Sequence, residues 1–371
     1  MRVLHFVTGG FSGATQVAVD LCLEARRSGS MEVLLVLRRK RHTDMRRVEA
    51  LRAQGLDVRL VPGWNHLATV LAVRRLALEW KPDILVAHGF SEHLWGRYAG
   101  WLAGVPHMVH VEHNSRERYT PWRLRQALWL ERRTAVSVGV SEGVRGHLVD
   151  LGFPVAQCVA IPNGIDTGRF PQASLVPWED REVSIVMAAR FARQKDHATL
   201  IRAVALLGER GWHPALQLAG LGKSRLLARN RALAARLGIA GQVHFLGQVS
   251  DVPNLLMHSR ICVLSTHYEG MPLSLVEGMA AGCACIGTNV VGVREVIRPD
   301  QTGLLVPEND AQALADALER LLAHPDEARR LAQAARQEAL RAFDIGLMQR
   351  RYAHLLMRVQ HDEAPDILPE D

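Results

Sequence analysis

The chain has 371 residues, of which 48% are hydrophobic, and a net charge of +7. It contains no run of about 18 uncharged apolar residues. This length exceeds one ordinary domain core, so two domains are expected, and the missing apolar run excludes a membrane-spanning helix. The first ten residues resemble a buried strand rather than a signal peptide, and five scattered cysteines are typical of a reduced protein, so we expect a cytoplasmic location.

Short apolar segments alternate with helical patterns through the first half of the chain. Residues 14–27, 66–80 and 124–133 have helical periodicity. The predicted strands between such helices are residues 3–7, 32–37, 58–61, 84–87, 108–111, 136–140 and 159–161. Because parallel strands need crossover connections, this alternation predicts a parallel sheet covered by helices on both faces.

The same alternation restarts after residues 162–182, an aperiodic segment with three prolines that is typical of a linker. The predicted strands of the second half are residues 183–188, 215–219, 243–245, 261–264, 284–287 and 303–306. Its predicted helices are residues 199–209, 223–237, 272–281, 311–322 and 327–343. The pattern therefore predicts a second doubly wound unit.

We predict an α/β fold with two Rossmann-like, doubly wound domains, residues 1–165 and 166–345. Ligands of open α/β sheets bind beyond the carboxyl ends of the strands, so a cleft between the facing domains is the expected site. A last helix over residues 346–361 is expected to pack back on the first domain. Residues 362–371 are expected to form a mobile acidic tail.

The segment from Glu269 to Glu277 has two carboxylates eight residues apart, with Pro272 between them. Proline suits the first turn of a helix, so Glu269 is expected on the loop before the helix and Glu277 on its second turn. Free amides at a helix N-terminus attract anions. A phosphate held there between two carboxylates suits a nucleotide sugar; the alternative is an ordinary helix with a surface glutamate.

Two cations follow the first strand of the second unit. Arg190 and Lys195 are expected at the carboxyl end of that strand, where they could neutralise a diphosphate. No metal site is expected, because strand alternation turns His110 away from His107 and His113, and no Asp-x-Asp motif stands out. His113 falls at a strand end, which suits an active-site residue as well as a structural one.

The positive charge is concentrated in the first half of the chain. Residues 1–165 contain 22 Lys and Arg against 14 Asp and Glu. Residues 38–47 hold one dense basic cluster, and residues 116–133 interleave arginines with aromatic residues. Nucleic acid, an anionic membrane surface, a phosphorylated acceptor and a plain solvated face all remain open as explanations.

Motifs along nearly the full length resemble retaining glycosyltransferases of family 4 (glycosyl transferases group 1), which have the two-domain GT-B fold. The most specific are Pro162-Asn-Gly-Ile-Asp166 and the two glutamates of the Glu269–Glu277 segment. The matching stretches are residues 12–17, 111–114, 140–142, 162–166, 189–195, 245–247, 269–282 and 302–307. One departure is Ser12, where relatives often have a second glycine beside the position of Gly13.

The resemblance implies a set of donor-binding residues. Glu277 would bind the ribose hydroxyls, and Glu269 would contact the hydroxyls of the transferred sugar. Arg190 and Lys195 would hold the diphosphate. The backbone contacts to the donor would come from Gly13, Gln248, Val249, Gly270, Met271 and Leu273.

The resemblance also implies the residues nearest the reaction. His113 would touch the sugar near the reacting carbon and act with Glu269, Arg190 and Lys195 as the catalytic set, while Asn114 would face the acceptor. We expect retention of configuration by front-face attack, in which the departing phosphate helps to take the acceptor's proton. No cofactor and no metal are expected.

The expected function is transfer of a hexose-type sugar from a nucleotide diphosphate donor, a UDP-sugar by preference. The acceptor would be a glycan or a polyprenyl- or other lipid-linked sugar in bacterial surface polysaccharide synthesis, at the inner face of the membrane. The basic first domain suits peripheral contact with an anionic membrane, and no nucleic-acid partner is expected. The alternatives are a sugar-nucleotide epimerase of the same fold and a non-catalytic basic binding module.

Overall fold

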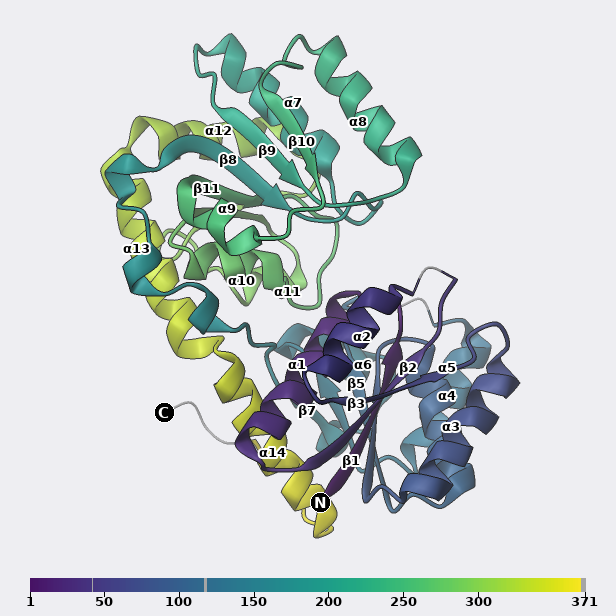
Figure 1. The fold of residues 1–371 in the computed structure, drawn as a ribbon. Helices are drawn as coiled ribbons and strands as arrows, with labels where there is room; N and C mark the ends of the chain where they lie inside the picture. Colours follow the sequence, from purple (N-terminus) through teal and green to yellow (C-terminus); the bar gives the residue numbers. More distant parts are fainter. Residues whose placement is uncertain (42, 117–118, 368–371) are drawn as a thin grey trace. The chain divides into compact units, whose positions relative to one another are not determined.

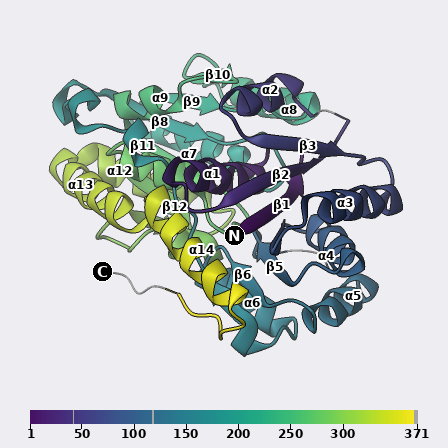
Figure 2. The same ribbon diagram turned by 60° about the horizontal axis from the view of Figure 1, so that its bottom comes forward.

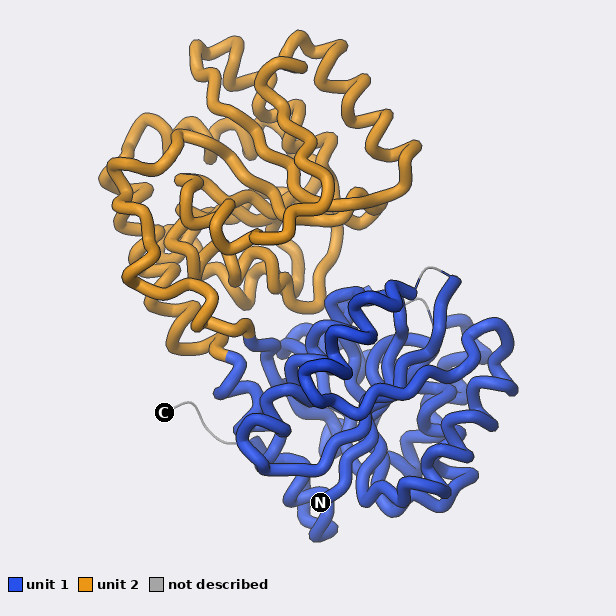
Figure 3. The backbone as a smooth tube through the Cα atoms, in the orientation of Figure 1, with its two compact units in different colours: residues 1–164, 345–371 blue, residues 165–344 orange. Residues whose placement is uncertain are grey.

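The computed structural model describes residues 1–41, 43–116 and 119–367. The chain forms two compact units (Figure 3). Unit 1 comprises Met1–Gly164 and Ile345–Asp371, and unit 2 comprises Ile165–Asp344. Each unit is a parallel sheet flanked by helices (Figure 1), so the α/β fold with two Rossmann-like units is confirmed.

Unit 1 contains a seven-stranded parallel sheet in the order β3-β2-β1-β4-β5-β6-β7. Its strands are β1 (Arg2–Thr8), β2 (Glu32–Arg38), β3 (Asp57–Val61), β4 (Ile84–His88), β5 (His107–Glu112), β6 (Val136–Gly139) and β7 (Cys158–Ala160). Its helices are α1 (Gly13–Ser28), α2 (Met45–Ala53), α3 (His66–Trp80), α4 (Glu92–Ala103), α5 (Pro121–Glu131), α6 (Glu142–Asp150) and α14 (Ile345–Gln360).

Strand β2 shows why both faces of this sheet are covered. Leu34 and Val36 belong to a core with residues of α3 and α4, whereas Leu35 and Leu37 belong to a core with residues of α1 and α2. Successive strand side chains point to opposite faces, so an uninterrupted apolar strand fills two cores at once.

The C-terminal helix α14 belongs to unit 1 and packs against α1 (Figure 2). Its buried residues include Met348, Tyr352 and Leu355. After it, Glu363 pairs with Arg358 at 3.1 Å. The last four residues of the predicted mobile tail, 368–371, lie outside the described residues.

Unit 2 contains a six-stranded parallel sheet in the order β10-β9-β8-β11-β12-β13. Its strands are β8 (Glu182–Ala188), β9 (Ala215–Ala219), β10 (Val243–Gly247), β11 (Ser259–Leu264), β12 (Ala284–Thr288) and β13 (Leu304–Val306). Its helices are α7 (His197–Glu209), α8 (Ser224–Arg236), α9 (Val252–His258), α10 (Leu273–Ala280), α11 (Val291–Arg294), α12 (Ala311–Ala323) and α13 (Pro325–Ala342).

The linker predicted over residues 162–182 contains short 3-10 turns, among them Thr167–Arg169. The turn is capped by Asp166, whose Oδ1 accepts from the amide of Gly168 at 3.0 Å.

No helix in the described part of the chain is both long and apolar enough to cross a membrane.

Candidate active site

The predicted donor residues of unit 2 lie in the loops at the carboxyl edge of its sheet or, for Leu273 and Glu277, on the helix α10 that follows one of these loops. Arg190 and Lys195 follow β8, Gln248 and Val249 follow β10, and residues 269–273 follow β11 and lead into α10. Parallel strands end at one edge of a sheet, so the topology brings these loops to the same side.

Glu269 is the most buried carboxylate of this edge, with 7% of its surface exposed. It forms an ion pair with the ammonium group of Lys195 and accepts a hydrogen bond from Thr266 Oγ1 at 2.8 Å. A buried carboxylate is stable only when it is paired and hydrogen-bonded. Lys195 and Glu269, 74 residues apart in the chain, therefore form one charged centre.

Backbone bonds hold the two loops of this centre together. The amide of Asp196 donates to the carbonyl of Ser265 at 2.9 Å, and the amide of His267 donates to the carbonyl of Gln194 at 2.9 Å. Both chain neighbours of Lys195 are therefore bonded through their backbone to the loop that carries Glu269. These bonds fix the backbone position from which the Lys195 side chain reaches Glu269.

Gly292 also supports the Glu269 loop, and sequence reasoning missed it. A Cβ at this position would overlap the carbonyl of Gly270 and lie 3.0 Å from the carbonyl oxygen of Glu269. The start of α11 can therefore approach the loop closely only because residue 292 is glycine. One sequence cannot reveal this contact, because the two segments are distant in the chain.

Helix α10 begins at Leu273, and Pro272 is its N-cap residue with a non-helical ψ of 88°. The expectation that Pro272 lies inside the first turn was therefore wrong by one residue. The first amides of the helix to bond within it are those of Leu275 and Val276, which donate to the Pro272 carbonyl at 3.0 and 3.2 Å. The amides of Leu273 and Ser274 come before them, as required for an anion site at this helix end.

Glu277 lies on the second turn of α10, as predicted, and is half-buried. Its Oε1 is 3.2 Å from Nη1 of Arg169. Burial raises the pKa of Glu277, and the nearby Arg169 guanidinium opposes that rise. Arg169 was missed from the sequence, although it follows the Pro-Asn-Gly-Ile-Asp motif by only three residues.

The other predicted donor residues of unit 2 are more accessible. Arg190 is exposed and has no ion pair with any residue that the structure describes. Gln248 is exposed and Val249 is partly buried. They follow Gly247, which has a positive φ of 68° and whose carbonyl accepts from the Gly220 amide at 2.7 Å.

In unit 1, His113 lies just beyond β5 and belongs to a row of three imidazoles. Its Nε2 is 3.3 Å from Nδ1 of His88, and Nε2 of His88 is 3.0 Å from Nδ1 of His5. Burial lowers the pKa of His113 to about 3 and that of His5 to about 4, and it holds the pKa of His88 well below its ordinary value. All three rings are therefore neutral at neutral pH.

The tautomers of these three rings are coupled. A neutral imidazole donates through one nitrogen and accepts through the other. A proton on Nε2 of His113 therefore requires protons on Nε2 of His88 and His5. Conversely, a proton on Nδ1 of His5 requires protons on Nδ1 of His88 and His113. The tautomer of His113, at the edge of the sheet, therefore depends on the tautomers of His88 and His5.

A second buried network lies around β5 and involves His110. His110 Nδ1 is 3.2 Å from Ser137 Oγ, which donates to Glu131 Oε1 at 2.5 Å. Glu131 in turn pairs with the buried Arg97 at 2.6 Å, and Arg97 Nη2 is 2.7 Å from Nδ1 of His93. Among the described residues, no group of three or more His, Cys, Asp or Glu side chains is arranged to hold a metal ion.

Gly13 and Asn114 are the remaining predicted residues of unit 1. Gly13 is the first residue of α1, and a Cβ built on it would meet no atom within 4 Å, so its backbone is open to a ligand. Ser12, the departure from the family pattern, is the N-cap residue, and its amide donates to Thr15 Oγ1 at 3.2 Å. The Asn114 amide donates to Glu112 at 3.2 Å.

The basic cluster predicted over residues 38–47 is not a continuous surface. Arg38 is only 4% exposed and pairs with Glu92 at 3.4 Å, and Lys40 pairs with the same carboxylate at 2.9 Å. The interpretation of Arg38 as part of a solvent-facing basic patch was therefore wrong. Glu92, 54 residues away in the sequence, could not be matched to it from the pattern alone.

Family models match both units. The model described as Glycosyltransferase Family 4 matches residues 11–169, and the model described as Glycosyl transferases group 1 matches residues 175–338. Among curated relatives, the putative glycosyltransferase EpsD of Bacillus subtilis (strain 168) is 32% identical over 48% of this chain and 49% of its own length, about half of each. The lipopolysaccharide core biosynthesis glycosyltransferase LpsE of Rhizobium meliloti (strain 1021) is 28% identical over 96% of this chain and 99% of its own length.

Solved structures match the fold as well. The structure of Anabaena HepE in complex with UDP-glucose superposes with a TM-score of 0.84 at 20% identity, over 96% of this chain and 99% of that one. At this identity the match shows the shared fold. The family models, the relatives and the fold agree, and the chain therefore belongs to the group 1, family 4 glycosyltransferases of the GT-B type, enzymes that transfer sugars.

Proposed function

We propose that the chain transfers a sugar from a nucleotide diphosphate donor, a UDP-sugar, to a glycan or lipid-linked acceptor, with retention of configuration and without a metal. The observation that carries this proposal is the centre formed by Lys195 and Glu269, which lies directly before α10. It combines a cation, a carboxylate and the first amides of a helix.

The cations and the amides have a direct use in the reaction. When the bond between the anomeric carbon and the diphosphate breaks, its electron pair moves to the phosphate oxygen. Arg190, Lys195 and the amides at the start of α10 would stabilise the charge that develops there. The acceptor oxygen would attack from the same face, and its proton would pass to the departing phosphate oxygen.

The two glutamates would bind the two ends of the donor. Glu269 would accept hydrogen bonds from the transferred sugar, beside the backbone of Gly270, Met271 and Leu273. Glu277 would accept hydrogen bonds from the ribose. Since Glu277 pairs with the half-exposed Arg169, the ribose would share this carboxylate with the guanidinium or displace it.

His113 would contact the transferred sugar, and Asn114 would face the acceptor. A neutral imidazole can donate or accept a hydrogen bond with a sugar hydroxyl, whereas an imidazolium can only donate. The low pKa of His113 therefore suits recognition of hydroxyls. The open backbone at Gly13 would allow a close approach of the donor.

Relatives and neighbours support the choice of donor and acceptor. HepE has been solved with UDP, with UDP and glucose, and with UDP-glucose. LpsE acts in lipopolysaccharide core biosynthesis, and the Escherichia coli (strain K12) relative WcaL is a putative glycosyltransferase of colanic acid biosynthesis. We therefore propose a surface polysaccharide as the product, and Gln248 and Val249 as backbone contacts to the uracil base.

The surface of unit 1 supports an acceptor held at a membrane. Trp64 is 83% exposed, Leu67 is 67% exposed and Trp122 is 69% exposed. Exposed tryptophans and leucines near basic residues suit the interface of an anionic bilayer. We accordingly propose peripheral contact of unit 1 with the inner face of the membrane.

The proposal is tested by thermal unfolding in the presence of UDP-, GDP- and ADP-sugars. A ligand that binds only the folded state at about 100 times its Kd adds about 2.7 kcal/mol of stability, so one UDP-sugar should raise the Tm by several degrees. Glu277→Ala should remove most of that shift, whereas Glu209→Ala, at an exposed position at the end of α7, should retain it.

Product analysis completes the test. With an acceptor present, sugar should appear on the acceptor with its anomeric configuration retained, and EDTA should leave the rate unchanged. Conversion of the donor to an isomer without an acceptor would favour the epimerase instead. A Tm that no nucleotide sugar raises would contradict the proposed donor site.

A further inference from the structure

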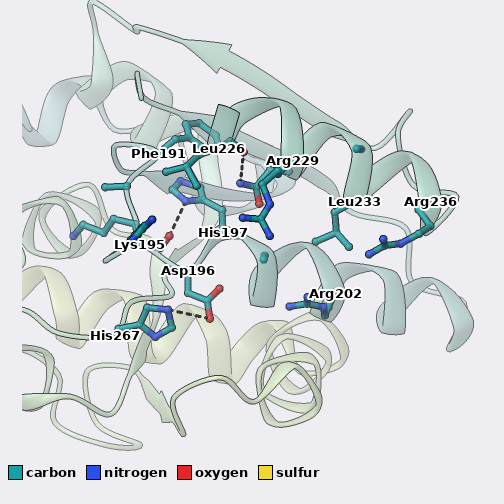
Figure 4. Close-up of a pocket in the computed structure, with 15 residues that line it drawn as sticks. Phe191, Lys195, Asp196, His197, Arg202, Leu226, Arg229, Leu233, Arg236 and His267 are labelled. Carbon is teal, nitrogen blue, oxygen red and sulfur yellow. Dashed lines mark hydrogen bonds and ion pairs between the residues drawn. The ribbon is translucent and has the colours of Figure 1, made fainter. Parts of the chain in front are cut away.

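A pocket of about 430 Å³ lies between α7 and α8 of unit 2 (Figure 4). We call it the α7–α8 pocket. Of the described residues that line it, Lys195 is the only one that also belongs to the proposed donor set. Part of the lining is apolar and includes Phe191, whose ring stacks on His197 with centroids 4.0 Å apart.

The lining of the α7–α8 pocket is strongly cationic. The arginines that line it are Arg193, Arg202, Arg229 and Arg236. All four side chains are exposed, and none of them forms an ion pair within the ranges that the structure describes. Arg210, one position beyond the end of α7, behaves differently, because it pairs with Asp316 at 2.7 Å and also with Glu319.

The sequence of α8 explains why these arginines lack partners. Residues 224–236 contain no Asp or Glu, so no carboxylate lies three or four positions away on the helix. Leu226, Arg229, Leu233 and Arg236 recur at intervals of three and four, which places them on one stripe of the helix. Helices α7 and α8 pack against each other, and Figure 4 shows Arg202 of α7 with Arg229 and Arg236 of α8 around the space between them.

One carboxylate, Asp196, lines the same pocket, and its two oxygens have different surroundings. Its Oδ1 accepts from the amide of Thr199 at 3.1 Å and so caps α7. Its Oδ2 is buried without a hydrogen-bond partner among the described residues, 4.0 Å from Nε2 of His267, so this carboxylate offsets part of the arginine charge. The four arginines outnumber this carboxylate, so the lining carries excess positive charge that no described residue neutralises, and a bound anion would relieve the mutual repulsion of these cations.

The pocket fits a specific class of anion. Guanidinium groups bind phosphate through paired hydrogen bonds, with a geometry that an ammonium group cannot match. The volume is within the range of about 300–1,000 Å³ that is usual for small-molecule sites. The apolar side chains of Phe191, Leu226 and Leu233 supply a surface for a ring beside the arginines.

We propose that the α7–α8 pocket is a second anion site, separate from the donor site, and that it binds a small phosphorylated carbohydrate. Arg202 and Arg229, from opposite helices, hold the phosphate, and the apolar lining contacts the sugar ring. The site goes beyond the proposed transfer reaction, because none of the proposed chemistry uses these arginines.

Isothermal titration with glucose 6-phosphate and with inorganic phosphate tests the proposal, with the donor site filled by saturating UDP. Glucose 6-phosphate should bind one to one, and more tightly than inorganic phosphate. In the double variant Arg202→Ala/Arg229→Ala its affinity should fall at least about tenfold, because both guanidinium groups that hold the phosphate are lost. Arg225→Ala is the matched control, since Arg225 is an exposed arginine of α8 outside the pocket lining, and it should bind like the wild type.

Three results would overturn the proposal: no binding of either probe at millimolar concentration, unchanged affinity in the double variant, or displacement of glucose 6-phosphate by UDP. Binding to phosphatidylglycerol vesicles that the double variant loses, without binding of the soluble probes, would assign the arginines to a membrane surface instead. A titration with UDP alone keeps the two hypotheses apart, because a failure of UDP to bind concerns the proposed donor site and not this pocket.

Discussion

The ammonium group of Lys195 has two roles. In the structure it neutralises the buried carboxylate of Glu269, and in the proposed reaction it also stabilises the departing diphosphate. A group with both duties affects stability and turnover together when it is replaced. The two effects can be separated, because only the first depends on the charge of Glu269.

Lys195→Ala should reduce kcat on the order of a hundredfold or more, since losing a charge-assisted contact to the leaving group costs about 2–4 kcal/mol. The free energy of unfolding should also fall, because Glu269 is left buried without its cation. The double variant Lys195→Ala/Glu269→Gln should regain stability but not turnover. Steady-state kinetics and urea unfolding measure both quantities, and Lys223→Ala, an exposed lysine before α8, is the control. Wild-type turnover by Lys195→Ala would exclude the proposed role.

At the scale of elements, Arg97 links α4, α5 and the turn before β6. It is fully buried, pairs with Glu131 at 2.6 Å and donates to Thr134 Oγ1 at 2.9 Å. A helix amphipathic pattern does not predict an arginine in the core. It is tolerated here because its guanidinium is bonded to Glu131, to Thr134 and to two atoms of His93.

Arg97→Met should destabilise unit 1 by about 3–5 kcal/mol, because it leaves the Glu131 carboxylate buried without a cation. Arg97→Met/Glu131→Leu should recover most of that loss. Urea unfolding followed by tryptophan fluorescence measures the change. Arg75→Met is the matched control: it breaks an exposed pair with Glu79 on α3 and should cost no more than about 0.5 kcal/mol. Equal costs for Arg97→Met and Arg75→Met would contradict the importance of the buried pair.

At the scale of the whole molecule, buried histidines make the stability depend on pH. His5, His88, His93 and His110 are at most 4% exposed, and burial lowers the pKa of each below its ordinary value of 6.5. As the pH falls below 6.5, the unfolded chain takes up protons that the folded chain does not bind. Acid therefore favours unfolding, and the stability is fully present only above that pH.

Each of these histidines should contribute about 1 kcal/mol of lost stability between pH 7 and pH 5.5. Urea midpoints measured by tryptophan fluorescence at several pH values test this, since six of the eight tryptophans lie in unit 1. His244→Gln, at an exposed position of unit 2, should leave the dependence on pH unchanged. A stability that stays constant from pH 7 to pH 5.5 would show that the four imidazoles are not held neutral by burial.

The sequence by itself determined the fold class and the loops that carry the proposed donor residues. Uninterrupted apolar strands and amphipathic helices are local patterns, and a parallel sheet then brings all its strand ends to one edge. The boundaries of α3 and α14 and the positions of Glu269 and Glu277 around α10 follow from such local patterns.

Only the tertiary structure decided which charges meet. The pairs of Lys195 with Glu269, Arg169 with Glu277 and Arg38 with Glu92 join residues 74, 108 and 54 positions apart. No periodic pattern connects such positions, because packing of distant segments sets their distances. The sequence could not predict the row of His5, His88 and His113 either, because that row forms only where β1, β4 and β5 are neighbours in the sheet. The α7–α8 pocket likewise exists only because two arginine-bearing helices pack side by side.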